Sequence, residues 1–325
     1  MAKIVQIQET GGPEVLKIED APVPSPGPSE VLIHQRAIGV NYIDIYHRTG
    51  LYKLMNYPIG LGLEAAGVVE KIGKSVTSLQ PGDRVAYCGG PVGAYAEYRC
   101  IPARHVIVLP DKVTNEQAAA SMLKGLTAHY LTYLTFRVQP GDTVLIHAAA
   151  GGVGLIACQM AKYLGATVLG TVSNEDKAIL ARENGCDYPI IYTQDNLVEK
   201  VKEYTAGRGV DVVYDSVGKT TFMDSLDCLK KFGMMVSFGQ SSGAIPPLDP
   251  AILSQKGSLY LTRPTLMDHI ENTDHYAANA QTLFDLIAKK VITVRIGGLY
   301  HLEEVRKAHM DLESRKTTGA LILQA

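Results

Sequence analysis

The sequence predicts an α/β protein in which a doubly wound parallel sheet is inserted in a mostly-β domain. Strand-like and helix-like segments alternate from residue 140 to about residue 263, which is typical of a parallel sheet covered by helices on both faces. Residues 1–110 instead contain short β-branched runs separated by Gly and Pro turns. A strand-like tail at the end of the chain is too short for a third domain, so we expect it to complete the first one. The expected domains are residues 1–123 with 264–325, and residues 124–263.

Composition argues against several classes of protein. The chain has 325 residues, of which 46% are hydrophobic and 20% are charged, as in globular proteins and unlike disordered ones. Its net charge of −2 argues against nucleic acid or an anionic membrane as the main partner. The five cysteines include no C-x-x-C pair, which is unlike a disulfide framework or a zinc knuckle. Because the start shows no signal-peptide pattern, we expect a cytoplasmic protein.

Periodicity and turn signals predict the individual elements. In the first domain we expect strands over 31–40, 67–73, 83–88 and 105–110, and a helix over 118–134 follows. The expected strands of the inserted domain are 143–147, 167–172, 189–192, 210–217, 234–239 and 258–262. Its expected helices are 153–164, 173–185, 196–205 and 221–230, and Ser173 is the expected N-cap of the second. A helix over 276–289 and strands over 291–296 and 320–323 complete the chain.

The strongest local signal is the turn within TVLIHAAAGGVGLIACQMAK (143–162), between a buried strand and a helix. In the dinucleotide-binding pattern G-x-G-x-x-G, the glycines permit a tight turn, close approach of the pyrophosphate and packing of the helix on the strand. Ala149 takes the first position here, and Gly151 and Gly154 take the other two. The backbone N–H groups of Gly152 and Val153 would open the helix and face the pyrophosphate. The turn therefore predicts a dinucleotide site.

The end of the second strand indicates which dinucleotide binds. NAD-specific folds carry Asp or Glu about 20 residues beyond the glycine turn, where it binds the ribose hydroxyls. Here no carboxylate stands at the strand tip, which ends in Ser173, and Lys177 lies one turn into the next helix. A 2′-phosphate carries about −1.5 to −2 charges, by analogy with phosphoserine, and needs such donors and cations. We therefore expect NADPH, with Ser173 and Lys177 as contacts; Glu175 and Asp176 nearby count against this interpretation.

Further segments form a recognisable set in order along almost the full chain: GGPEVL (11–16), GVNYIDIYHRTGLY (39–52), GLEAAGVV (62–69), KGLTAHYL (124–131), VVYDSVG (212–218), MVSFGQSSG (235–243) and KGSLYLTRP (256–264). Together with the glycine turn they resemble the quinone oxidoreductases of the medium-chain dehydrogenase/reductase superfamily, relatives of zeta-crystallin. The resemblance implies a GroES-like β domain made from both chain ends, a Rossmann domain between them and a homodimer joined through the Rossmann sheets. It also implies NADPH as cofactor and a quinone as small-molecule substrate.

Zinc alcohol dehydrogenases of the same superfamily differ from this chain at their metal ligands. They bind the catalytic zinc through a Cys, the His of a G-H-E motif and a later Cys or Asp. Asn41 stands in the position of the first Cys, and Leu63 replaces the histidine in Gly62-Leu63-Glu64. The four clustered cysteines of the structural zinc are also missing after Cys88. Because zinc needs four ligands, or three and a water, we expect no metal.

The resemblance further implies a set of cofactor contacts. Those near the nicotinamide are Asn41, Tyr42, Ile43, Asp44, Ile45, Tyr46, Tyr130, Phe238, Gly239, Gln240, Ser241, Pro264 and Leu266, and Ser216 and Val217 follow a strand tip. Gly152 and Val153 lie under the pyrophosphate, within the turn Gly151–Gly154. The 2′-phosphate end adds Tyr192 and Arg315 to Ser173 and Lys177. Arg315 has no local signal, because its surroundings resemble an ordinary charged surface turn.

The expected reaction is the reduction of a quinone by NADPH without a metal. A quinone is already electrophilic and water can protonate its reduced oxygens, so the protein needs no strong general acid. Asn41 could donate its amide to an acceptor oxygen, and Tyr46 or Tyr52 could donate a proton. One alternative is a zinc-free NADPH-dependent reductase of activated C=C bonds, as in enones and alkenals. An alternative of another class is an RNA-binding or crystallin-like structural role.

Overall fold

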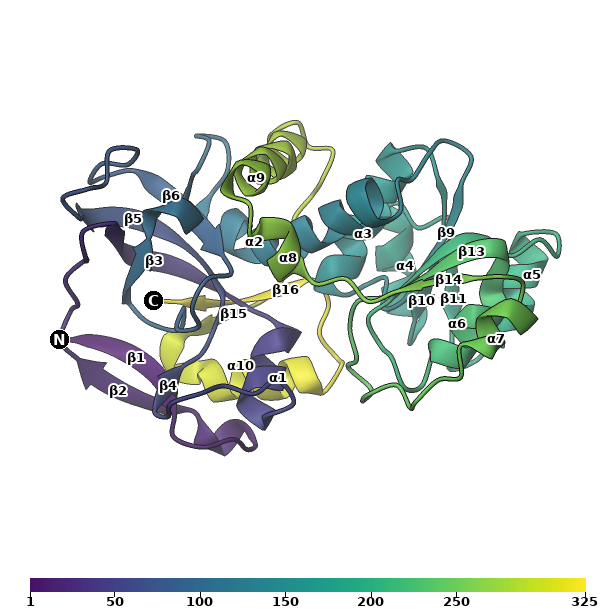
Figure 1. Ribbon diagram of the computed structural model, residues 1–325, viewed down its shortest axis with the longest axis horizontal. Coiled ribbons are helices and arrows are strands. Elements are labelled where there is room, and N and C mark those ends of the chain that lie inside the picture. Colours follow the sequence, from purple (N-terminus) through teal and green to yellow (C-terminus); the bar gives the residue numbers. More distant parts are fainter. The chain divides into compact units, whose positions relative to one another are not determined.

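The computed structural model describes the whole chain, Met1–Ala325, which forms two compact units (Figure 1). Unit 1 consists of Met1–Leu126, Ile270–Ala288 and Val294–Ala325, and unit 2 consists of Thr127–His269 and Lys289–Thr293. The divisions after residues 126 and 269 lie a few residues beyond those expected after 123 and 263. The first division falls within a single helix, α2 (Asn115–His129).

The larger sheet of unit 1 contains residues from both ends of the chain. Its strands are β3 (Glu30–Val40), β5 (Glu64–Ile72), β6 (Arg84–Cys88), β7 (Tyr98–Pro102), β8 (Ile107–Val108), β15 (Ile296–His301) and β16 (Ala320–Gln324). Their order is β15-β16-β3-β5-β6-β8, and β7 also pairs with β3. β16 runs antiparallel to β3, with Leu321 opposite Val40. The tail of the chain therefore completes the sheet that its first third begins.

Unit 1 also has a three-stranded sheet of β1 (Ala2–Ile7), β2 (Lys17–Ala21) and β4 (Ile59–Gly60), and the helices α1 (Tyr42–Thr49), α9 (Thr273–Ala288) and α10 (Val305–Glu313). α1 starts with a capping box in which the Asn41 backbone N–H donates to Asp44. It ends at Gly50, whose φ of 80° suits a residue without a β-carbon. α10 packs on the core of the unit through Val305 and Ala308.

Several elements differ from the sequence prediction, which also omits β1, β2, β4 and β7 of unit 1. The pattern predicts neither α1 nor α10, and α1 is rich in aromatic and β-branched residues that favour strands. The strand expected over 291–296 is wrong: β15 starts at Ile296, because pairing with β16 begins there, opposite Ala320. The helix expected over 118–134 is α2 followed by a π-helix, Tyr130–Thr135.

Unit 2 is a six-stranded parallel sheet, which confirms the predicted doubly wound fold. Its strands are β9 (Thr143–Ile146), β10 (Thr167–Val172), β11 (Tyr188–Ile191), β12 (Val210–Asp215), β13 (Leu229–Ser237) and β14 (Tyr260–Thr262), in the order β11-β10-β9-β12-β13-β14. The sheet is wound in opposite directions from β9, and such folds bind ligands at the carboxyl ends of the strands beside this reversal. The helices are α3 (Gly152–Tyr163), α4 (Glu175–Glu183), α5 (Leu197–Tyr204), α6 (Phe222–Cys228), α7 (Ala251–Gln255) and α8 (Leu266–Ile270).

One predicted cap in unit 2 is wrong. Asn174, not Ser173, caps α4, because its side-chain oxygen accepts the Lys177 N–H at 3.0 Å. Ser173 therefore belongs to the tip of β10. None of the helices combines the length and the apolar character that crossing a bilayer requires.

Candidate functional site

The turn after β9 has the geometry that a dinucleotide site needs. α3 begins at Gly152 with Gly151 as its N-cap, so the first N–H groups of the helix have no acceptor within it. A β-carbon on Gly154 would lie 2.2 Å from the backbone oxygen of Ala148, so glycine alone allows α3 to approach the turn so closely. The free N–H groups and the helix dipole can hold an anion such as a pyrophosphate.

A buried polar network, not predicted from the sequence, connects the ends of β9, β10 and β12. The His147 ring contacts Thr171 Oγ1 at 3.1 Å and Ser225 Oγ at 2.9 Å. Ser225 in turn donates to Asp215 Oδ2 at 3.1 Å, and Asp215 Oδ1 accepts the Val217 N–H at 2.7 Å. Burial lowers the pKa of His147, so the imidazole is neutral near pH 7. The network holds together the strand ends that carry the predicted contacts.

Three predicted contacts of the 2′-phosphate lie at the neighbouring ends of β10 and β11. These strands are parallel, with Val172 opposite Ile191, and Ser173 and Tyr192 are the residues that follow them. The Tyr192 N–H donates to the Val172 oxygen at 3.1 Å. Lys177 lies in the first turn of α4, where burial lowers the pKa of its ammonium. The fold thus brings a hydroxyl, a phenol and an ammonium group to one edge of the sheet, with no carboxylate at the tip of β10.

The residues predicted near the nicotinamide in unit 2 follow β12 and β13. The Phe238 N–H donates to the backbone carbonyl oxygen of Asp215 at 2.8 Å, and the Ser241 N–H donates to the backbone carbonyl oxygen of Ser216 at 3.1 Å. A β-carbon on Gly239 would lie 2.6 Å from that same Ser216 oxygen, so the two loops are in close backbone contact. This contact brings six of the predicted residues together at the carboxyl ends of β12 and β13: Ser216, Val217, Phe238, Gly239, Gln240 and Ser241. Pro264 and Leu266 follow β14.

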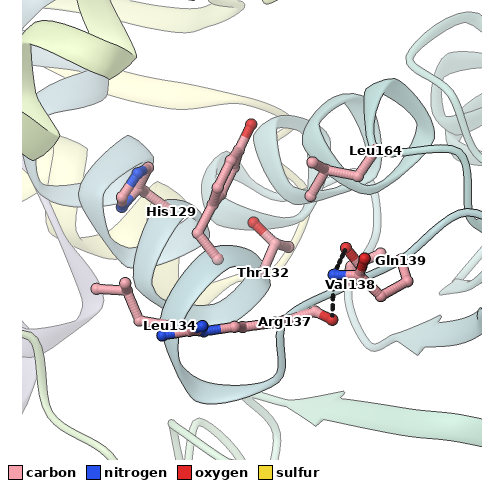
Figure 2. Close-up of a pocket in the computed structure, with 8 residues that line it drawn as sticks. His129, Thr132, Leu134, Arg137, Val138, Gln139 and Leu164 are labelled. Carbon is pink, nitrogen blue, oxygen red and sulfur yellow. Dashed lines mark hydrogen bonds between the residues drawn. The ribbon is translucent and has the colours of Figure 1, made fainter.

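Tyr130 lies in the π-helix, a conformation frequent at functional sites. Its ring stacks on His269, with centroids 4.4 Å apart and an angle of 8° between the planes. A pocket with a volume of about 440 Å³ lies along the same π-helix, and Figure 2 shows the residues that line it. None of the predicted cofactor contacts lines it; the lining residues are His129, Thr132, Tyr133, Leu134, Arg137, Val138, Gln139 and Leu164.

In unit 1, the amide of Asn41 is engaged on both sides by buried partners. Its Nδ2 donates to Glu64 Oε2 at 2.8 Å and to the Gly39 oxygen at 3.4 Å. The Lys124 ammonium donates to Asn41 Oδ1 at 2.7 Å and lies 3.4 Å from Glu64 Oε2. Lys124 is therefore the counter-ion of Glu64, although the two residues are 60 positions apart in the chain. Asn41 could donate to an acceptor only by giving up one of these bonds.

Three tyrosines of unit 1, which we call the aromatic row, contact one another along α1 and the turn after it: Tyr42, Tyr46 and Tyr52. The ring centroids of Tyr42 and Tyr46 are 5.4 Å apart, and those of Tyr46 and Tyr52 are 5.0 Å apart. The Tyr52 N–H donates to the backbone carbonyl oxygen of Tyr46 at 3.0 Å, which fixes the turn. Both predicted proton donors therefore belong to one aromatic group.

Asp44, predicted near the nicotinamide, is completely buried. Its Oδ2 accepts the Asn41 N–H and the Tyr95 hydroxyl, each at 2.8 Å. Desolvation raises the pKa of this carboxyl to about 7. Ile45 is buried beside it and Ile43 is partly exposed. No sequence signal distinguishes Asp44 from its neighbours, because Tyr95 is 51 residues away.

Arg315, the fourth predicted 2′-phosphate contact, belongs to unit 1. It follows the end of α10 at a left-handed φ of 59°.

The residues present do not fit a zinc site. Nowhere in the structure do three or more His, Cys, Asp or Glu side chains come close enough together to hold a metal ion. The cation beside Glu64 is the Lys124 ammonium, and Leu63 is a buried apolar residue. All five cysteines are free thiols.

Known proteins match this chain over nearly its whole length. Residues 27–111 match the alcohol dehydrogenase GroES-like domain, which agrees with the predicted character of unit 1, and residues 152–289 match the zinc-binding dehydrogenase family. A quinone oxidoreductase of Pseudomonas aeruginosa is 49% identical over 323 residues, covering 99% of both chains. A 2-haloacrylate reductase of a Burkholderia species is 43% identical over 329 residues, again covering 99% of both. The crystal structure of an Escherichia coli quinone oxidoreductase complexed with NADPH has a TM-score of 0.98 at 46% identity and covers 100% of both chains.

Proposed function

Because this chain belongs to the quinone oxidoreductases of the medium-chain dehydrogenase/reductase superfamily, we infer that it reduces quinones with NADPH as cofactor. When bound, NADPH supplies a hydride from C4 of its nicotinamide. One observation of the structure carries the cofactor assignment: the open N-terminus of α3 at a glycine turn, beside a strand tip without a carboxylate. The residues of the chain then have to bind the phosphates, orient the ring and receive the acceptor.

Each end of the cofactor has its own group of proposed contacts. The N–H groups of Gly152 and Val153 bind the pyrophosphate through hydrogen bonds and the dipole of α3. Lys177 and Ser173, at the end of β10, bind the 2′-phosphate, and Tyr192 and Arg315 complete this group. The loops after β12 and β13, held together by their backbone hydrogen bonds, contact the nicotinamide.

The aromatic row contacts the acceptor in this proposal. Tyr46 and Tyr52 carry hydroxyls that can donate a proton to a reduced quinone oxygen, and their rings, tilted by 58° to each other, are apolar groups against which a substrate ring can pack. Asn41, whose amide is held by Glu64 and Lys124, shapes the start of α1 rather than donating to the acceptor.

A screen of acceptors tests the proposed function. Purified protein is mixed with NADPH and either a series of benzoquinones and naphthoquinones or a series of alkenals, and NADPH oxidation is followed by absorbance. We expect a higher kcat/KM with quinones than with alkenals. With a quinone as acceptor, we expect a much lower kcat/KM for NADH than for NADPH. Oxidation with alkenals but not with quinones would assign the chain to the alternative below.

A reductase of activated C=C bonds is the second candidate function. The 43% identity to a 2-haloacrylate reductase favours it, because that chain is also similar over its full length. The same NADPH hydride would then be transferred to a carbon conjugated to a carboxylate or carbonyl. Adding 2-haloacrylates to the acceptor screen separates the two functions directly.

We also propose that the reaction needs no metal. Support comes from the Lys124 ammonium beside Glu64 and from the absence of a close group of metal-ligating side chains. Activity should survive dialysis against a chelator, and elemental analysis should find less than one zinc per chain. Loss of activity on chelation, restored by zinc, would contradict the proposal.

A homodimer joined through the sheets of unit 2 is a further part of the proposal. β14 is an edge strand of its sheet, and Tyr260 and Leu261 on it are 58% and 39% exposed. Light scattering of the purified protein should give twice the 35.1 kDa of one chain, and Tyr260→Lys should reduce it toward one. The five unpaired cysteines support a cytoplasmic location, which cell fractionation tests.

A further inference from the structure

α1 has two faces with different chemistry. Tyr42 and Tyr46 belong to the aromatic row, which we propose to contact the acceptor. Asp44 and Arg48 are four residues apart, so they lie on a common face of the helix, and both are almost completely buried. A short surface helix does not need a buried carboxylate and a buried guanidinium in order to fold, so their partners are informative.

Two side chains, Tyr95 and His309, connect Asp44 to Arg48 by hydrogen bonds. We call the closed ring of these four side chains the α1 clamp. Tyr95 Oη lies 2.8 Å from Asp44 Oδ2 and 3.0 Å from His309 Nε2. The other ring nitrogen, His309 Nδ1, lies 3.1 Å from Arg48 Nη1. The ring closes through α1 itself, so the clamp fastens one helix at two points.

The protons of the clamp have a single consistent arrangement. A guanidinium can only donate, so His309 Nδ1 must accept from Arg48. Burial and the nearby guanidinium lower the pKa of His309 to about 3, so its imidazole is neutral and carries one proton, on Nε2. That proton is donated to Tyr95, which leaves the Tyr95 hydroxyl to donate to Asp44. Every hydrogen bond of the clamp thus has one direction, and the chain of bonds ends at Oδ2 of the Asp44 carboxyl group on α1.

The partners of α1 in the clamp are held by the rest of unit 1. The Tyr95 backbone is fixed on both sides, by a bond to the Leu61 oxygen at 2.9 Å and one from the Val5 N–H at 2.8 Å. His309 belongs to α10, which packs into the core of the unit. A β-carbon on Gly62 would lie 2.4 Å from the Tyr95 ring, so this ring occupies space that only glycine leaves open. The clamp therefore sets the position of α1 against a rigid support.

Burying such groups is a poor way to gain stability, because desolvation offsets most of the attraction between them. A closed set of directional hydrogen bonds holds the helix in one defined position, whereas an apolar contact of equal size allows the helix several positions. We propose that the α1 clamp positions the aromatic row for the reduction of the acceptor. The proposal rests on the proposed function, and it makes the buried clamp residues, Asp44 included, positioning residues rather than contacts of the acceptor.

Two matched tyrosine variants test the clamp. Tyr95→Phe removes the hydroxyl that joins His309 to Asp44 and keeps the ring. Tyr87→Phe is the control: Tyr87 is also completely buried in unit 1, donates to Gln35 and accepts from Arg99, and is no part of the clamp. We expect Tyr95→Phe to lower kcat with a quinone about tenfold, because a misplaced contact costs rate. The NADPH Kd should stay within about twofold, and Tyr87→Phe should keep the kcat of the wild type at a similar loss of Tm.

A second pair of variants covers the case in which Tyr95→Phe does not fold. His309→Gln keeps one acceptor for Arg48 and one donor for Tyr95, whereas His309→Leu keeps neither. We expect His309→Gln to retain most of the kcat and His309→Leu to lose about tenfold. Equal kcat values for the two His309 variants, or for the two tyrosine variants, would overturn the proposal and leave the clamp a structural feature.

The wild-type protein separates this result from a failure of the proposed function. If it oxidises NADPH with alkenals or 2-haloacrylates and not with quinones, the proposed quinone activity is wrong. The same four variants are then compared with the active acceptor, and the expected ratios are unchanged, because the clamp acts through α1 whichever acceptor binds.

Discussion

The two units present their polar groups by different means. At the carboxyl ends of the strands of unit 2, the groups proposed to bind the pyrophosphate are backbone N–H groups of a glycine turn, within a few residues of one another. On α1 of unit 1, the polar groups are buried side chains, and the partners Arg48 and His309 are 261 residues apart. The first site is determined by local conformation and the second by the folding of the whole unit.

This difference predicts where each region is vulnerable. A backbone site is damaged by side chains that occupy the space the turn needs, because its hydrogen-bonding groups cannot be removed by substitution. A side-chain network is damaged by removing a partner, because the remaining polar group stays buried without a hydrogen bond. Four experiments test this contrast: three substitutions, from the largest expected effect to the smallest, and one dependence of stability on pH.

Removing the cation of the α1 clamp should have the largest effect on stability. Arg48→Ala leaves His309 Nδ1 without its donor and Glu313 without its ion pair at 2.7 Å. We expect a loss of about 3 kcal/mol in the free energy of unfolding, the lower end for a broken buried pair, because Glu313 remains one-third exposed. Urea unfolding followed by circular dichroism measures it. Arg36→Ala, at an exposed position of β3, should change stability by less than about 0.5 kcal/mol, and equal losses would contradict the contrast.

Lys177→Ala should weaken NADPH binding without affecting NADH. A charged hydrogen bond to the 2′-phosphate contributes about 1.5–3 kcal/mol, so the NADPH Kd should rise about 10- to 150-fold. Fluorescence titration with each nucleotide measures both values. Lys202→Ala, an exposed lysine of α5, should leave both unchanged. An equal weakening of NADH would show that Lys177 does not contact the 2′-phosphate.

Adding a methyl group to the glycine turn should lower the free energy of unfolding more at Gly154 than at Gly151. On Gly154 it would lie 2.2 Å from the Ala148 oxygen and 2.8 Å from the Ala149 Cα, so the backbone must move. We expect Gly154→Ala to lose about 1–3 kcal/mol. On Gly151 the nearest atom is 3.1 Å away, so Gly151→Ala should lose less. The reverse order in urea unfolding would mean that close packing of α3 does not limit the turn.

The carboxyl of Asp44 should make the stability of the protein depend on pH. Desolvation raises its pKa in the folded state to about 7, against the lowering effects of its bonds with Asn41 and Tyr95 and of the Lys124 charge, whereas Glu64 raises it further. Between about pH 4 and pH 7 the folded state keeps a proton that the unfolded chain has released. The free energy of unfolding therefore falls as pH rises, by up to about 1.4 kcal/mol per pH unit, and levels off above pH 7.

Asp44→Asn tests this dependence, because its side chain carries no titrating proton. In this variant the contribution of residue 44 to the pH dependence of the free energy of unfolding should vanish. The difference between the wild-type and variant plots of unfolding free energy against pH then gives the effect of Asp44 alone. Parallel curves for wild type and variant would show that this carboxyl has an ordinary pKa.

The same contrast explains what the sequence predicts. The strands and helices of unit 2 follow from continuous apolar runs and turn residues, and the contacts Gly151–Gly154 follow from a motif of six residues. α1 is missed because YIDIYHRT has the composition of a strand, and its two caps outweigh that preference. The partners of Asp44 and Glu64 carry no local signal, since a buried tyrosine or lysine in a sequence is defined only by the residues that the fold places around it.

The pairing of β16 with β3 has a consequence for how the protein is made. A ribosome that has released residues up to about 270 has already delivered every strand of unit 2, so that unit can fold during translation. β3, by contrast, is synthesised among the first 40 residues and can pair early with β5 and β7, but its pairing with β16 has to wait for residues 320–324. His309 arrives almost as late. A chain stalled shortly before its end would hold a folded nucleotide-binding unit beside an open sheet edge, which is a target for chaperones and for aggregation.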